Sequence, residues 1–310
     1  MQKHILVFGS FVVDLMSRNP HLPTPGETVL GSFFKMGPGG KGFNQGVAAH
    51  KSGGNVTMVT KIGQDAFGDV ARRTMEQLGM DTTYLLVSET HSTGAAQVLV
   101  DENTSQNMIS VVSGACATIT EEDIARLEPL IEQSSYLLMQ LEVNLEANWR
   151  VLALAKQHGV TTILNTAPAQ SLPDEILSQI DIVTPNEVEA EMLTGIPVEN
   201  EENAHKAAQV FFEKGIKAVV ITLGSRGVYV ATPEKQQLLP VPKVDVLDTT
   251  GAGDAFNGGF VTALSEGKDL WEAARFANAL ASLSVQRMGT TASMPTRAEI
   301  DEFVAEHPEM

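Results

Sequence analysis

Cysteine is almost absent from the sequence: Cys116 stands alone among 310 residues, so no disulfide can form within the chain. A chain without disulfides is typical of a reducing compartment, and we expect a cytoplasmic location. The surrounding stretch SGACAT offers no base that would activate a thiol. We therefore expect Cys116 to be a small packed side chain and not a nucleophile.

Positive charge is also scarce. The chain has 21 lysines and arginines against 38 aspartates and glutamates, which gives a net charge of −17. No basic tract offsets this excess, so the composition argues against a nucleic-acid or anionic-membrane partner. A small phosphate-bearing ligand is not excluded, because backbone amides can bind anions in an acidic protein.

Long apolar runs and linkers are missing as well. No run approaches the roughly 20 apolar residues of a membrane span. The first apolar run is broken by Gly9 and Ser10 and ends at Asp14, which is typical of a strand and not of a signal peptide. No Pro- or Gly-rich linker, repeat or low-complexity tract divides the chain, and 43% of its residues are apolar. We expect residues 1–310 to form a single domain.

Short β-rich runs alternate with longer helical patterns along most of the chain. Several of the strands are apolar without alternation, as expected when both faces of a sheet are covered. The pattern predicts an α/β fold with a doubly wound, mostly parallel sheet flanked by helices on both faces. The expected strands are 5–9, 56–63, 136–142, 160–165, 180–186 and 217–224, and the expected helices are 44–52, 66–78, 121–133, 145–158, 187–194, 201–214, 254–266 and 270–286.

Two segments, 11–36 and 93–113, read as extended chain without helices between the strands. The second reads as a hairpin around DENTSQN. We expect these segments to form a small β-sheet lid attached to the main sheet.

Polar residues follow several of the expected strands. Glu142, Asn165, Asn186 and Gly224 stand at strand ends, and a Gly/Asp cluster at 248–254 precedes a late helix. In open α/β sheets, ligands bind outside the carboxyl ends of the strands. We therefore expect these distant residues to converge on one edge of the sheet.

The stretch GPGGKGFNQG, residues 37–46, contains a literal GxGxxG. A dinucleotide site would need that motif in the first strand-to-helix turn. Walker A also fails, because Lys35 stands where Gly is needed and Gly42 stands where Ser or Thr is needed. One reading is a Gly-rich turn that opens a helix. The other is a loop whose free amides, together with Lys41 and Asn44, hydrogen-bond a polyhydroxyl ligand.

The stretch DTTGAGDAFNGGF, residues 248–260, places small residues and an acid at the start of a helix. Phe256 and Phe260 mark the apolar side of that helix, which begins near Gly253. Two glycines in three residues exceed what a cap needs and suggest that something approaches the backbone. By contrast, Asn186 and Glu189 in TPNEVEAEMLTG satisfy a capping box, and TLGSRGVYV alone is a hairpin.

Taken in order, these motifs resemble the ribokinase family of sugar and nucleoside kinases. The resemblance also includes FGSFVVDL, PTPGETV, GQDAFGD and LLMQLE, and it covers nearly the whole chain. It implies ATP-dependent phosphoryl transfer to the primary C5 hydroxyl of a pentose, with D-ribose as the first candidate. A kinase of 2-deoxy-D-ribose or another small sugar is the alternative. A catalytically silent sugar sensor is a third reading, which loss of Asp254 or of the glycines before it would have signalled.

The resemblance assigns roles residue by residue. Asp254 matches the catalytic base, and Gly251, Ala252 and Gly253 match an anion hole for the γ-phosphoryl group. The matched sugar ligands are Asp14, Gly40, Lys41, Asn44, Glu142 and Asp254. The matched ATP contacts are Asn186, Thr222, Leu223, Gly224, Ser225, Arg226, Gly227, Gly253 and Asn278. Asn186 and Glu189 match a pair that organises Mg²⁺ through water. The matched K⁺ ligands, mostly through backbone carbonyls, are Asp248, Thr250, Ser284, Arg287, Gly289 and Ser293.

Three positions depart from the family pattern. Val12 stands where Asn is usual, and Phe43 replaces a small residue, so both bear on the identity of the sugar. Asn278 stands where His is frequent and concerns adenine-side packing. We also expect a homodimer through the lid, because its segments would leave an exposed sheet edge in a monomer.

Overall fold

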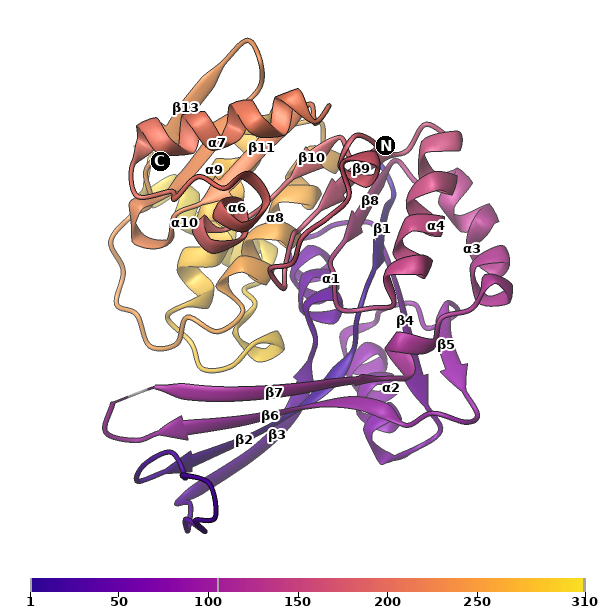
Figure 1. Ribbon diagram of the computed structural model, residues 1–310, viewed down its shortest axis with the longest axis vertical. Coiled ribbons are helices and arrows are strands. Elements are labelled where there is room, and N and C mark those ends of the chain that lie inside the picture. Colours follow the sequence, from indigo (N-terminus) through magenta and orange to yellow (C-terminus); the bar gives the residue numbers. More distant parts are fainter. Residues whose placement is uncertain (1, 105, 309–310) are drawn as a thin grey trace.

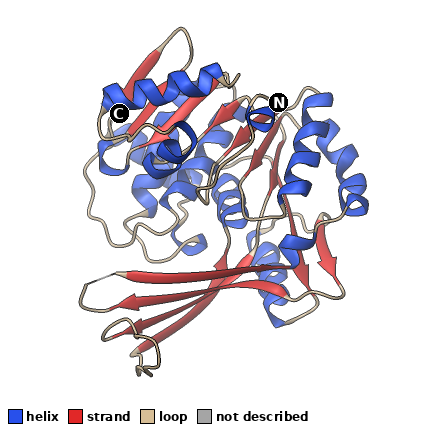
Figure 2. Ribbon diagram, viewed as in Figure 1, coloured by secondary structure: helices blue, strands red, loops and turns tan. Residues whose placement is uncertain are grey.

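The computed structural model describes residues 2–104 and 106–308 as two sheets and a set of helices (Figure 2). The larger sheet has the strand order β13-β12-β11-β10-β9-β8-β1-β4-β5. It is parallel from β5 to β11 and antiparallel across β12 and β13. The strands are β1 (Ile5–Phe8), β4 (Val56–Gly63), β5 (Leu85–Ser88), β8 (Tyr136–Met139), β9 (Thr161–Leu164), β10 (Ile182–Val183), β11 (Ala218–Thr222), β12 (Val228–Ala231) and β13 (Gln236–Leu239).

Helices cover both faces of this sheet (Figure 1). On one face α8 packs against both α1 and α9, and on the other α3 packs with α4 and α6 with α7. This confirms the predicted doubly wound α/β sheet. The helices are α1 (Lys41–Lys51), α2 (Ala66–Leu78), α3 (Glu121–Gln133), α4 (Leu145–Gln157), α5 (Asp174–Leu177), α6 (Glu187–Thr194), α7 (Glu201–Glu213), α8 (Ala252–Ser265), α9 (Leu270–Ser284) and α10 (Arg297–Glu306).

Strand β1 lies between β4 and β8, and the chain winds away from it in opposite directions on its two sides. Such a switch point opens a crevice at the carboxyl ends of the strands. All four residues of β1 are buried and apolar, so this strand anchors the crevice in the core.

The second sheet has the order β3-β2-β6-β7, and we call it the lid sheet. Its strands are β2 (Val12–Asn19), β3 (Phe33–Gly39), β6 (Thr93–Asp101) and β7 (Asn107–Gly114). They fall largely within the two segments expected to be extended, and the β6–β7 hairpin forms as expected, with residue 105 of its turn outside the described part. In Figure 1 the lid sheet lies across the end of the main sheet at which β1 finishes.

Several short elements were not expected from the sequence, among them β5, β13, α5 and α10. The predicted strands 136–142 and 180–186 are also shorter than expected, because their last residues leave the sheet to form loops at its carboxyl edge. Cys116 is buried, and burial raises the pKa of its thiol, as expected for a packed side chain. Among residues 2–104 and 106–308, no helix is long and apolar enough to cross a bilayer.

Candidate active site

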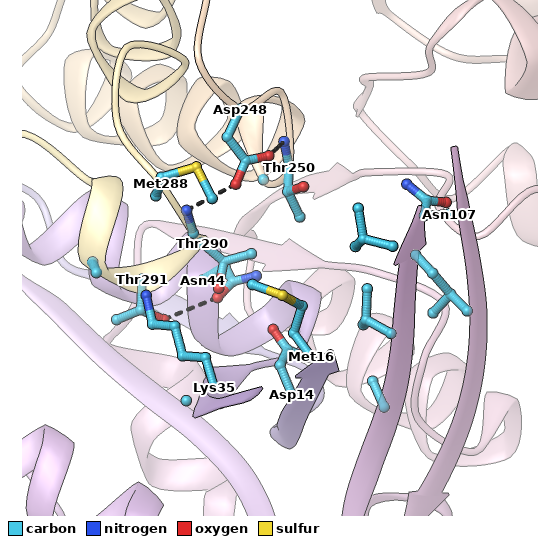
Figure 3. Close-up of a pocket in the computed structure, with 18 of the residues that line it drawn as sticks. Asp14, Met16, Lys35, Asn44, Asn107, Asp248, Thr250, Met288, Thr290 and Thr291 are labelled. Carbon is cyan, nitrogen blue, oxygen red and sulfur yellow. Dashed lines mark hydrogen bonds between the residues drawn. The ribbon is translucent and has the colours of Figure 1, made fainter. Parts of the chain in front are cut away.

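A cleft of about 480 Å³ lies between the lid sheet and the carboxyl edge of the main sheet (Figure 3). One wall consists of alternate residues of the lid strands, including Val12, Asp14 and Met16 of β2. The opposite wall consists of the start of α1, the turn before α8 and the loop before α10. The cleft therefore brings together segments from four distant parts of the chain.

The Gly-rich stretch forms the junction between β3 and α1. Gly40 has φ 91°, and a Cβ there would stand 2.9 Å from the backbone oxygen of Ser10, so only glycine fits. The next residue, Lys41, donates its amide to Glu142 Oε2 at 2.9 Å, and the Ser10 hydroxyl donates to the same oxygen at 2.5 Å. The loop after β8 is thereby fixed against the first turn of α1.

Asp254 lies in the first turn of α8, where this helix packs against α1, and it is 6% exposed. Its Oδ2 accepts from Asn44 Nδ2 at 3.0 Å, and its Oδ1 accepts from Gln45 Nε2 at 3.0 Å. Burial raises the pKa of the Asp254 carboxyl, whereas the Lys41 ammonium and these two hydrogen bonds favour its ionised form. The result is an oriented carboxylate whose pKa lies above its ordinary value.

Two further carboxylates share this part of the cleft. Burial, with Glu142 and Asp254 nearby, raises the pKa of Asp14 to about 6. Burial alone would lower the pKa of the Lys41 ammonium. The charges of Asp254, Glu142 and Glu189 outweigh burial and raise that pKa. The carboxylates provide hydrogen-bond acceptors and the partly buried Lys41 ammonium provides donors, which suits a ligand rich in hydroxyl groups.

The turn before α8 leaves amides without partners in the helix. Gly251 has φ 78° and provides no side-chain cap, and the first i→i−4 bond runs from Ala255 N to Gly251 O at 2.8 Å. The amides of Gly253 and Asp254 precede that bond, and a Cβ built on Gly253 would meet nothing within 4 Å. The amide of Ala252 already donates to Thr249 O at 3.2 Å, whereas those of Gly253 and Asp254 have the geometry of a helix N-terminus that can bind an anion.

The residues matched to ATP lie beyond the cleft, around the ends of β10 and β11. Asn186 caps α6 in a capping box with Glu189 and forms a parallel bridge with Thr222. Burial raises the pKa of Glu189, and hydrogen bonds from Asn186 and the charge of Lys41 oppose that rise. The predicted cap is therefore confirmed, and its carboxylate lies within electrostatic reach of the cleft.

The other residues matched to ATP are more dispersed. Gly224, Ser225 and Arg226 form a 3₁₀ turn (η2) after Leu223. The Arg226 guanidinium is held by the backbone of the α6–α7 connection, and by Glu187 at 3.1 Å. Gly227 has φ 101°, and a Cβ there would collide with the backbone of Leu239. Asn278, on α9, donates to Pro240 O at 3.2 Å.

Of the residues matched to K⁺, three lie together. Asp248 Oδ1 accepts from Thr250 N and its Oδ2 from Gly289 N, both at 2.9 Å. The side chains of Ser284, Arg287 and Ser293 form hydrogen bonds with Ala281, Glu299 and Thr290. Within the described ranges, no three His, Cys, Asp or Glu side chains gather as a metal site.

One residue expected to influence the sugar lies outside the cleft, and two residues of the site were missed in the sequence. Val12 lines the cleft as expected, but Phe43 does not: it is fully buried and packs edge-on against Phe11, so its expected influence on the sugar is wrong. Gln45 was missed, although it directly follows Asn44. Thr291 was missed too, and its hydroxyl lies 3.0 Å from Asn44 Oδ1.

Comparisons with known proteins agree over nearly the whole chain. The family described as "pfkB family carbohydrate kinase" matches residues 2–297. The chain is similar to the ribokinase of Haemophilus influenzae, with 45% identity over 98% of the chain and 99% of that protein. It is 36% identical to the deoxyribokinase of Salmonella typhi, over 97% and 98% of the two. The structure of Arabidopsis thaliana ribokinase complexed with ribose and ATP has a TM-score of 0.90 at 32% identity, over 98% and 99% of the chains.

Proposed function

Because the chain belongs to the pfkB family of carbohydrate kinases, we propose that it transfers the γ-phosphoryl group of ATP to the C5 hydroxyl of D-ribose. The observation that carries the proposal is the position of Asp254: a buried carboxylate, oriented by Asn44 and Gln45, one residue after the open amide of Gly253. Asp254 accepts the hydroxyl proton while the sugar oxygen bonds to the γ-phosphorus. The bond from that phosphorus to the β-phosphate oxygen breaks, and ADP leaves.

The remaining assignments in the proposal are those that the family resemblance implies. Asp14, Lys41, Asn44 and Glu142 bind the sugar, with the amide of Gly40, and the amides of Gly251, Ala252 and Gly253 receive the developing charge on phosphorus. ATP lies over Asn186 and the segment 222–227, with Asn278 towards its base. The lid sheet, 11–36 and 93–113, closes over the sugar within one kinase domain.

Two cations belong to the proposal. Mg²⁺ commonly keeps several waters and binds one or two carboxylates plus phosphates, which fits the buried Glu189 beside Asn186. The turn through Asp248 and Thr250, joined to Gly289, would hold K⁺ through backbone oxygens, with Ser284, Arg287 and Ser293 contributing theirs. Mg²⁺ would neutralise phosphate charge, and K⁺ would steady the turn that begins the anion hole.

A second candidate substrate is 2-deoxy-D-ribose. Val12 favours this sugar, because an apolar side chain lines the cleft at a position where a polar side chain would form a hydrogen bond with a hydroxyl group. A silent sugar sensor is disfavoured, because Asp254 and the glycines before it are all present. Location in a reducing cytoplasm remains a prediction from the cysteine count.

A homodimer through the lid is the proposed assembly. The lid face turned away from the cleft carries exposed apolar side chains, and we call it the outer lid face. Their exposed fractions are 64% for Phe34, 48% for Met36, 53% for Met108 and 66% for Val112. Alternation along the strands places them opposite the cleft-lining residues.

The test is a coupled assay of ADP release over a panel of pentoses, deoxypentoses, hexoses and nucleosides. We expect turnover with D-ribose or 2-deoxy-D-ribose and none without Mg²⁺. Rates should be higher in K⁺ than in Li⁺ at equal ionic strength. Absence of turnover on every sugar would overturn the kinase proposal, and equal rates in the two salts would overturn the K⁺ site alone.

A further inference from the structure

Two loops meet at the N-terminus of α8 through a single carboxylate. Asp248 holds the amide of Thr250, in the turn that leads to Gly251, and the amide of Gly289, in the loop before α10. We call residues 287–291 the Gly289 loop. Because one carboxylate binds both amides, a shift of the Gly289 loop moves the turn from which the anion hole begins.

The lid strand β3 reaches the Gly289 loop at two places. At its inner end, the Pro38 carbonyl lies 3.3 Å from the Thr290 hydroxyl and 3.4 Å from the Thr291 hydroxyl. Three residues further out, Lys35 Nζ lies 3.5 Å from the position that a Cβ of Gly289 would occupy. Figure 3 shows the Lys35 side chain extending from the lid towards this loop. The ammonium therefore lies beside the backbone of Gly289, whose amide Asp248 holds.

Charge supports this contact. Lys35 lines the cleft in a chain whose net charge is −17, and Arg18 lines it from the neighbouring strand β2. The lid thus presents two cations to a loop that is anchored by the Asp248 carboxylate.

We infer that Lys35 is a positioning residue of this kinase, which fixes the Gly289 loop from the lid and so sets the geometry of the anion hole. The inference rests on the proposed role of the α8 N-terminus as the site of the transferred phosphoryl group. It connects the two substrate sites: the strand that covers the sugar also holds the loop that shapes the phosphoryl site. Among the hydrogen bonds described, none joins Lys35 to a proposed sugar ligand.

The decisive variants are Lys35→Met, which keeps the apolar stem and removes the charge, and Lys35→Arg, which restores it. Lys206→Met on α7 is the charge-matched control, since Lys206 pairs only with Glu202 of its own helix among the contacts described. For Lys35→Met we expect kcat to fall about tenfold, less than the roughly hundredfold that a misplacement of 1 Å can cost. The KM for the sugar should stay within about twofold, because Lys35 does not contact the sugar ligands. Lys35→Arg should recover most of kcat.

Nucleotide binding gives a second readout that needs no turnover. Magnesium adenylyl imidodiphosphate carries a γ-phosphoryl group, and ADP does not. In calorimetry, Lys35→Met should therefore weaken binding of the analogue and leave binding of ADP unchanged. The expected loss of affinity is about threefold, which is the size of one interaction at a helix terminus. Three outcomes would each overturn the inference. They are a Lys35→Met variant with unchanged kcat and unchanged affinity for the analogue, a rise in the KM for the sugar alone, and failure of Lys35→Arg to restore kcat. If wild type binds nucleotide but phosphorylates no sugar, the proposed function fails, and the two titrations still decide the role of Lys35.

Discussion

Gln45 donates one amide to two acceptors: its Nε2 lies 3.0 Å from Asp254 Oδ1 and 3.0 Å from Asn165 Oδ1. Its own Oε1 accepts from Gln140 at 2.6 Å, and Gln45 is fully buried. The proposed base is therefore held by a network that extends from α1 to the ends of β8 and β9. A buried network of this kind both orients a side chain and favours one protonation state.

Removal of the Gln45 amide should move the pH profile. Its hydrogen bond favours the ionised carboxylate, so Gln45→Leu should raise the pKa of Asp254 further. A base acts when ionised, so activity falls as pH drops through that pKa, and the acidic limb of kcat/KM should shift to higher pH. Hydrogen bonds to charged groups are worth roughly 1.5–3 kcal/mol, which corresponds to about one to two pH units.

The matched control is Gln133→Leu at the end of α3, where the side chain is exposed and lies outside the lid sheet. Both variants should be checked by thermal unfolding, because Gln45→Leu leaves Gln140 and Asn165 short of a partner at a cost of roughly 1–3 kcal/mol. A folded Gln45→Leu whose acidic limb coincides with that of wild type would show that Gln45 does not tune the base.

Asp254→Asn tests the base itself. The change keeps the shape and removes the proton acceptor, so kcat should fall by about three orders of magnitude, within the range usual for general bases. Nucleotide affinity should persist, because the open amides of the turn are unchanged. Calorimetry with ADP provides that check, and residual turnover within tenfold of wild type would contradict the assignment.

The outer lid face should hold two copies together. Phe34→Asp places a charge among Met36, Met108 and Val112, and burying an unpaired carboxylate in an apolar interface is costly. We expect wild type to sediment as a dimer at micromolar concentration and Phe34→Asp as a monomer. Val188→Asp, on α6 with 65% exposure, is the control for a similar change elsewhere. A monomeric wild type would refute the proposed assembly.

Local sequence signals predicted the helices well but not all their ends. The helix expected at 44–52 begins at Lys41, because Gly40 takes a positive φ that lets the backbone turn into α1 three residues earlier. The missed α10 carried a capping box, Thr296 with Glu299, directly after Pro295. The strand β5 has four residues at a sheet edge, too few to show a period.

The site was predictable where residues act through the backbone or in motifs, and less so where they act through packing. Successive residues of a helix point about 100° apart, so Phe43 faces Phe11 in the core while Asn44 faces Asp254. Gln45 gave no periodic signal, and its partners at 140, 165 and 254 meet only after α1 docks on the sheet. The contact between Lys35 and the Gly289 loop likewise depends on where the lid lies.

Val12 and Asp14 lie on the same face of β2, and both line the cleft. Val12 pairs with Gly39 on one side and Gly94 on the other, and neither neighbour has a side chain that could supply a hydrogen bond in its place. At 3% exposure, Val12 is a fixed apolar surface next to the acids proposed to bind the sugar hydroxyls. A substrate with a hydroxyl at this position therefore loses a partner there, and a deoxy substrate does not.

Sugar preference should accordingly be relaxed or inverted. A lost hydrogen bond costs roughly 0.5–1.5 kcal/mol net, and a buried hydroxyl left unpaired costs roughly 1–3. Since about 1.4 kcal/mol is tenfold, Val12→Asn should raise the ratio of kcat/KM for D-ribose over 2-deoxy-D-ribose by about one order of magnitude. Val12→Leu, which stays apolar, should leave the ratio near that of wild type. If wild type strongly prefers ribose and Val12→Asn does not change the ratio, the hydroxyl that separates the two sugars is not read at Val12.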